Sequence, residues 1–177
     1  MGIAQSLTAI VLGLAAPAVH TSDGPALQTV ASACAGATST VGGTHAQLEA
    51  MYCGVNVVRR AYRVGVVHGN GPLNRSSVMK ANAVRRCGFS HTPCGMSFMS
   101  TFRRAGYLPA RALGENLAWG QAELGSPLET LAGWLDSPPH RANLLAPRWR
   151  DLGIAVQQGH MFGLDDVSLW VMEFGRR

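Results

Sequence analysis

Three side chains in the middle of the sequence are of the kinds that perform acid–base chemistry or bind metals, namely His91, Glu115 and His140. Glu115 lies within the mostly apolar segment 113–119, where a carboxylate must be paired, hydrogen-bonded or functional. Two imidazoles and one carboxylate could act as general acid and base, and His91 and His140 could bind a divalent metal such as zinc or magnesium. A lone histidine is usually structural, so the spacing alone identifies candidates and not a site.

The elements that must position these residues are predicted from capping signals and periodicity. Segment 113–119 is predicted as a short strand that carries Glu115. Residues 126–129 (SPLE) form a capping box that opens a helix. Residues 137–139 (SPP) end that helix and start a shorter one with His140 in its first turn. Residues 89–95 are predicted as a loop that presents His91.

Two longer helices are predicted before this region. Thr44 and Gln47 match a capping box, with Thr44 as the N-cap, and apolar residues recur behind it at helical spacing as far as residue 62. A second helix is predicted from residue 74 or 76 to Gly88, with Val78, Met79 and Val84 facing the core.

The composition is that of one globular domain of the α+β class. The chain has 177 residues, of which 47% are hydrophobic and 14% charged, and strand patterns occur at 152–156 and 167–174. The net charge of +5 is carried by scattered arginine pairs without a dense basic stripe, so no nucleic-acid partner is predicted. A basic surface could favour anionic envelope polymers or lipid, although a solvated face is the simpler interpretation.

The N-terminus is typical of an export signal. Residues 3–19 contain no charged side chain, and residues 16–18 (APA) suit signal peptidase, so residues 1–18 are predicted to be a cleaved signal peptide. An uncleaved anchor is the alternative, but the apolar run is short for a membrane span, so no transmembrane helix is expected in the mature protein. Residues 19–43 are predicted to be a flexible leader before a domain at 44–177. The protein is therefore expected to be extracellular, either secreted or in the cell envelope.

Four cysteines suit an oxidising compartment and two disulfides. Three pairings are possible, and Cys34–Cys53 with Cys87–Cys94 is preferred because each bond closes a local loop. A zinc site formed by Cys87, His91 and Cys94 is the competing interpretation, although its spacing is not that of a zinc finger.

Four motifs along the sequence resemble those of one known family. They are residues 89–91 (FSH), 114–120 (GENLAWG), 134–145 (WLDSPPHRANLL) and 150–156 (RDLGIAV). In this order, behind an export signal, they are similar to bacterial CAP-domain proteins. These form the SCP-like extracellular family, which is related to cysteine-rich secretory proteins, insect venom antigens and plant pathogenesis-related proteins. The resemblance runs from about residue 48 to residue 175.

The resemblance implies a three-layer α-β-α sandwich whose central cleft is lined by two histidines and two glutamates that can bind a divalent metal. His91, Glu115 and His140 match three of these positions. Ser137 stands at the fourth, so weaker metal affinity is expected, and the orientation of Glu173 in the last strand is open. The remaining motif residues are expected to be scaffold or supporting groups: Asn116, Trp119, Trp134, Arg141 and Asn143.

Two classes of function are compatible with the resemblance. The favoured class is a secreted, non-enzymatic binding or structural module for an apolar or lipid ligand, a cell-envelope component or a protein partner. The alternative is a peptidase-like hydrolase in which histidine and glutamate activate a water, with or without a metal. No Gly-x-Ser-x-Gly motif occurs, and Ser137 is the one serine considered as a nucleophile.

Overall fold

The computed structural model describes residues 23–177, so the predicted signal peptide at 1–18 lies outside the described part. The helices are α1 (Gly24–Ala33), α2 (Gly43–Ala61), α3 (Gly71–Cys87), α4 (Ser100–Arg104), α5 (Pro127–Asp136) and α6 (Pro138–Leu144). Short 3-10 turns occupy η1 (Pro93–Gly95) and η2 (Ala122–Gly125). The strands are β1 (His68–Gly69), β2 (Ala112–Gln121), β3 (Asp151–Met161) and β4 (Leu164–Arg176).

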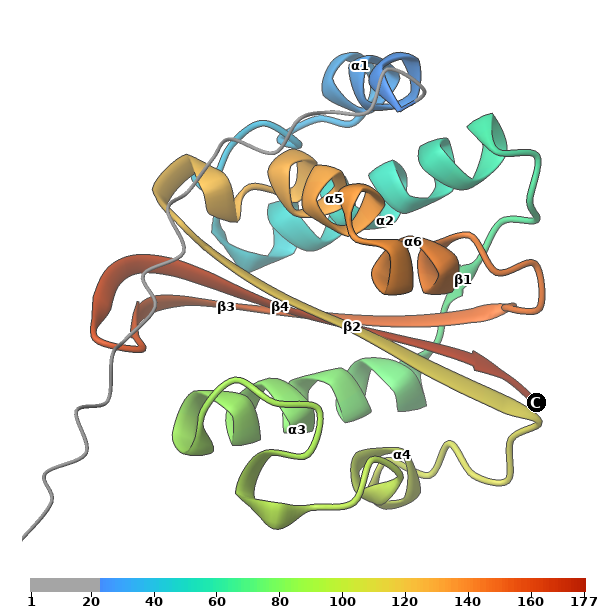
Figure 1. Ribbon diagram of the computed structural model, residues 1–177, viewed down its shortest axis with the longest axis vertical. Helices are drawn as coiled ribbons and strands as arrows, with labels where there is room; N and C mark the ends of the chain where they lie inside the picture. The colour runs from blue at the N-terminus through green and yellow to red at the C-terminus, as the bar shows by residue number, and fades with distance from the viewer. Residues whose placement is uncertain (1–22) are drawn as a thin grey trace, which may run out of the picture.

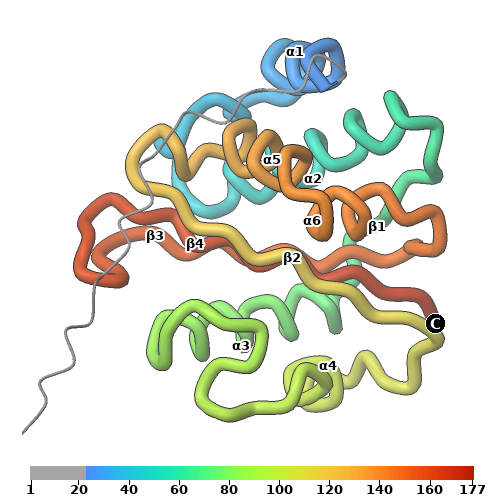
Figure 2. The backbone as a smooth tube through the Cα atoms, in the orientation of Figure 1, coloured from blue at the N-terminus to red at the C-terminus, as the bar shows by residue number. Residues whose placement is uncertain are grey.

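The sheet forms the middle of three layers (Figure 1). Helices α1, α2, α5 and α6 lie on one face of the sheet, and α3 and α4 lie on the other, which the backbone tube also shows (Figure 2). The α+β class and the α-β-α sandwich expected from the sequence are therefore confirmed.

The strand order is β1-β3-β4-β2, which places β2 at an edge of the sheet. Strands β3 and β4 form an antiparallel hairpin, and β2 pairs antiparallel with β4 in a register that puts Glu115 opposite Glu173. The two-residue strand β1 pairs parallel with β3. Because β2 is an edge strand, one of its sides has no neighbouring strand in the described part of the chain.

Alternation along β4 divides the apolar core between the two faces. Trp170 and Phe174 belong to the cluster that includes residues of α1, α2 and α5. Val171 packs instead with Val84 of α3. Because successive side chains of a strand point to opposite faces, Glu173 lies on the α3 face.

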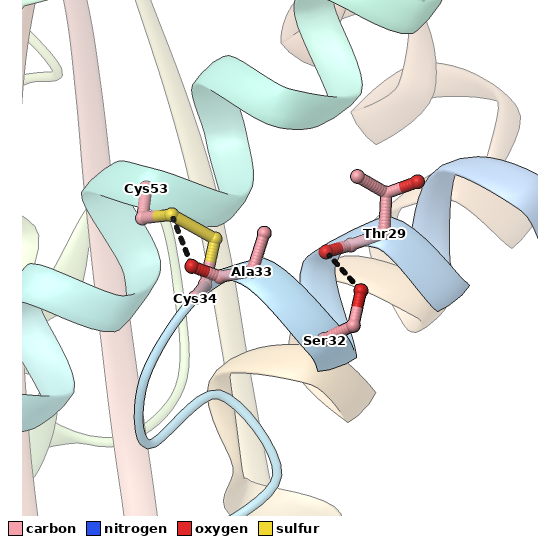
Figure 3. Close-up of a disulfide and its surroundings, with 5 residues drawn as sticks. All are labelled: Thr29, Ser32, Ala33, Cys34 and Cys53. Carbon is pink, nitrogen blue, oxygen red and sulfur yellow. Dashed lines mark hydrogen bonds between the residues drawn. A yellow bond between two sulfur atoms is a disulfide. The ribbon is translucent and has the colours of Figure 1, made fainter.

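Residues 24–33 form helix α1, so the prediction of a flexible leader at 19–43 is wrong for this segment. Leu27 and Val30 are buried in the core cluster that also contains residues of α2 and α5. The Cys34–Cys53 disulfide joins the end of α1 to α2, as Figure 3 shows. The apolar face of α1 and this disulfide hold the segment against the domain, although its small and polar residues suggested an exposed chain.

Both preferred disulfides, Cys34–Cys53 and Cys87–Cys94, are present. The second one closes the loop after α3. It also excludes the alternative zinc site of Cys87, His91 and Cys94, because zinc binds thiolates and these sulfurs are bonded to each other. Within residues 23–177, no helix is both long and apolar enough to cross a membrane.

Of the two predicted capping boxes, the one at α5 is confirmed and the one at α2 is wrong. Helix α5 begins as predicted, because the Ser126 hydroxyl accepts a hydrogen bond from the N–H of Glu129. Helix α2 begins at Gly43, and the capping bond predicted for Thr44 does not form. Gln47, its predicted partner, is buried instead.

The face that helix α3 turns to the core differs in part from the expected one. Val78 was predicted to lie inside, but it is 47% exposed. Val84 is buried as predicted, but Ser77 and Lys80 are buried in place of Val78. Polar residues on the inner face concealed the orientation of this helix in the sequence.

Gly153 of β3 marks a close approach of α3 to the sheet. A Cβ atom added there would lie 2.3 Å from the backbone carbonyl carbon of Leu73. We therefore expect Gly153→Ala to lower the free energy of unfolding by about 1–3 kcal/mol through overpacking. The matched control is Gly133→Ala in α5, where an added Cβ meets nothing within 4 Å. The control should raise stability by up to about 1 kcal/mol. Urea unfolding measures both, and equal midpoints would contradict the close approach.

Candidate functional site

Glu115 of β2 is the centre of the candidate site, and its side chain is only 1% exposed. Its Oε1 atom lies 2.7 Å from Nδ1 of His91, and Oε2 lies 3.1 Å from Nζ of Lys80. The Lys80 ammonium also donates a 2.7 Å hydrogen bond to the backbone carbonyl of His91. Two partners, one in α3 and one in the loop after it, therefore compensate the burial of this carboxylate.

The next residue of β2, Asn116, holds helix α6 on the opposite face of the sheet, and α6 and the loop after α3 form the two walls of the site. The Asn116 side chain donates to the carbonyl of His140 and accepts from the Asn143 amide, each at 3.0 Å. Adjacent residues of one strand thus fix the loop after α3 below the sheet and α6 above it (Figure 1). Because β2 is an edge strand, these two walls meet at the edge of the sheet.

A cleft of about 580 Å³ opens between the two walls. Burial, and then the charge of His91, lower the pKa of His140. The Nδ1 atom of His140 lies 2.8 Å from the Ser137 hydroxyl oxygen, while Nδ1 of His91 is engaged by Glu115. Among residues 23–177, this arrangement leaves Nε2 of each ring for a ligand or a proton. The cleft is lined by His91, Glu115, Asn116, Pro139, His140, Ala142, Asn143 and Arg148.

An apolar groove of about 340 Å³ adjoins the cleft and shares His140 with it. Phe89 and Trp119 line this groove and are 46% and 42% exposed. Phe162, in the turn between β3 and β4, contacts both rings, with centroid distances of 6.3 Å to Phe89 and 5.7 Å to Trp119. These three aromatic residues form an exposed cluster at the rim of the groove.

Glu173 of β4 is a second buried carboxyl group beside the site. It pairs in register with Glu115 and is fully buried on the α3 face. The hydroxyls of Ser77 and Thr101 lie 3.5 and 3.3 Å from its oxygens. Burial raises the pKa of Glu173 to about 8, and the neighbouring Glu115 carboxylate acts in the same direction. Glu173 is therefore protonated at neutral pH, and it faces neither solvent nor the lining of the cleft.

The other motif residues have distinct roles. Trp134 is buried and its indole N–H donates to the Leu117 carbonyl, which agrees with a scaffold role. Trp119 was grouped with the scaffold but is exposed in the aromatic cluster. Arg141 donates to both carboxylate oxygens of buried Asp23, at 2.9 and 2.8 Å, and so ties the start of α1 to α6.

Metal binding by His91 and His140 stays a prediction. Within residues 23–177, no three His, Cys, Asp or Glu side chains are arranged to hold a metal ion. Lys80 and Asp23 also belong to the site or its support, and neither was predicted from the sequence. Lys80 could have been predicted, because it follows Leu73 by seven residues, a spacing that places both on the same face of a helix. No comparable sequence signal marks Asp23.

Comparison with known proteins supports this architecture. The family described as CAP, the cysteine-rich secretory protein family, matches residues 54–174. No curated protein matches the sequence.

Three solved bacterial structures share the fold. An SCP-domain extracellular protein from Bacillus anthracis has a TM-score of 0.62 at 19% identity, over 76% of this chain and 41% of its own. An outer surface protein from Borrelia burgdorferi has a TM-score of 0.63 at 19% identity, over 74% and 92%. A cysteine-rich secretory protein from Staphylococcus aureus has a TM-score of 0.61 at 15% identity, over 77% and 40%. The chain thus spans about two fifths of the Bacillus and Staphylococcus chains.

The two histidines should titrate as neighbours. Because the charge of His91 lowers the pKa of His140, we expect His91→Asn to raise the pKa of His140, as measured by NMR titration of the imidazole signals. His160→Asn is the matched control, since His160 pairs with Asp165 near the β3–β4 turn. An unchanged His140 pKa in His91→Asn would show that the rings do not share the cleft.

Proposed function

The chain belongs to the cysteine-rich secretory protein (CAP) family, and from this premise we propose that it is an extracellular binding module for an amphipathic, lipid-like ligand. One observation carries the proposal, namely the apolar groove that runs into the polar cleft at His140. Two disulfides suit an oxidising compartment, and similar structures include an extracellular protein and an outer surface protein.

The two parts of the site suit the two parts of such a ligand. The apolar part would lie against Phe89 and Trp119, in a groove whose volume is typical of small-molecule sites. The polar end would lie between the imidazoles and Arg148. Because Lys80 balances the charge of Glu115, the lining of the cleft favours an anionic end group.

Dodecanoate is a suitable probe of this site. We expect Trp119→Ser to weaken its binding by about 10- to 100-fold, the effect of losing one buried aromatic contact, in a calorimetric titration. The thermal midpoint should change little, because Trp119 is 42% exposed before any ligand binds.

Val41→Ser is the matched control, because Val41 is 81% exposed and does not line the groove. It should leave the dissociation constant unchanged. Equal dodecanoate binding in Trp119→Ser and wild type would contradict the proposal and direct the search to envelope polymers and protein partners.

A hydrolase is the second candidate, favoured by the 2.7 Å contact between Glu115 and Nδ1 of His91. A carboxylate at Nδ1 orients an imidazole so that Nε2 can accept a proton from water. For this candidate, His91→Gln should lower turnover of a fluorogenic peptide library by about 100-fold or more, while His160→Gln should not. Absence of turnover in the wild type would contradict the hydrolase.

A further inference from the structure

The one lysine of the chain lies in the core of the protein beside the cleft. Apart from Lys80, every residue among the 15 lysines and arginines of the chain is an arginine. Its side chain is 1% exposed on the inner face of α3. A buried ammonium is costly unless it is paired, so its partners indicate its role.

Those partners fix the ammonium against Glu115. Nζ of Lys80 lies 3.1 Å from Oε2 of Glu115 and donates to the carbonyl of His91 at 2.7 Å. The ring of Phe98 packs on the same ammonium, with its centroid at 5.6 Å. Oε2 accepts no hydrogen bond within residues 23–177, so the lysine charge is what compensates this oxygen.

A metal ion that took Glu115 as a ligand would need the position that the Lys80 charge controls. Zinc binds carboxylate oxygens at about 2.0–2.2 Å, and an ion at that distance from Oε2 would lie close to the Lys80 ammonium and be repelled by it. The other oxygen of Glu115 already faces Nδ1 of His91. Glu115 therefore does not suit a divalent metal as a ligand, and the two histidines would have to hold such an ion without this carboxylate.

We propose that Lys80 is a built-in cation, which neutralises Glu115 in place of a divalent metal and makes the cleft independent of metal ions. The compact ammonium suits this role better than the broad, planar guanidinium used elsewhere in the chain. Glu173 does not disturb the balance, because burial raises its pKa to about 8 and keeps it neutral at neutral pH. The inference concerns the cleft itself and holds whether or not a lipid-like ligand binds there.

Zinc titration of the full chain tests the proposal. Calorimetry on the wild type and on the His91→Asn/His140→Asn double variant should give the same heats, from surface histidines such as exposed His160. With isotope-labelled lysine, the single side-chain ammonium signal should not move on zinc addition. A zinc site that is present in the wild type and lost in the double variant would overturn the proposal.

A second comparison removes the lysine charge. We expect Lys80→Gln to bind zinc at least about tenfold more tightly than the wild type, and Lys80→Gln/Glu115→Gln to lose that gain. A folded Lys80→Gln variant with no gain would also overturn the proposal. If Lys80→Gln does not fold, as judged by circular dichroism, the comparison of the wild type with the histidine variant decides.

Discussion

A carboxylate that leaves water needs positive charge or hydrogen-bond donors around it, and this need of Glu115 joins the layers of the protein. Helix α3 supplies the ammonium of Lys80, and the following loop supplies the imidazole of His91. The site and the packing of α3 on the sheet are therefore one arrangement, and removing one member would leave a buried charge without its partner.

The opposite wall is held by a separate set of contacts. Asn116 fixes α6 through the carbonyl of His140, and Arg141 ties the same helix to Asp23 at the start of α1. Helix α1 is itself joined to α2 by a disulfide. A segment outside the residues matched by the family thus contributes to the placement of His140.

Much of this arrangement could be predicted from the sequence, because local signals carry it. The motif order placed His91, Glu115 and His140 together, and the short spacings of the cysteines favoured the observed disulfides. Lys80 was missed because charge usually marks the outside of a helix, whereas here the inner face of α3 is polar. Helix α1 was missed because its stability comes from tertiary packing and a cross-link, not from its composition.

The exposed aromatic cluster could not be predicted from the sequence for a different reason. Phe89, Trp119 and Phe162 come from three separate segments, and only the fold brings their rings together. A tryptophan inside a family motif suggested scaffold, yet Trp119 lies at the rim of the groove. Long-range contacts of this kind have no periodicity that a single sequence could reveal.

The position of the cleft at the free edge of β2 has a consequence for how such a protein can diverge. Its two walls belong to opposite layers and meet only across one strand, so each can be lengthened or replaced without rebuilding the other. Evolution could therefore change the loop after α3, or the segment around α6, independently of the other. Glu115 and Asn116 are the shared anchor that any such change would have to keep.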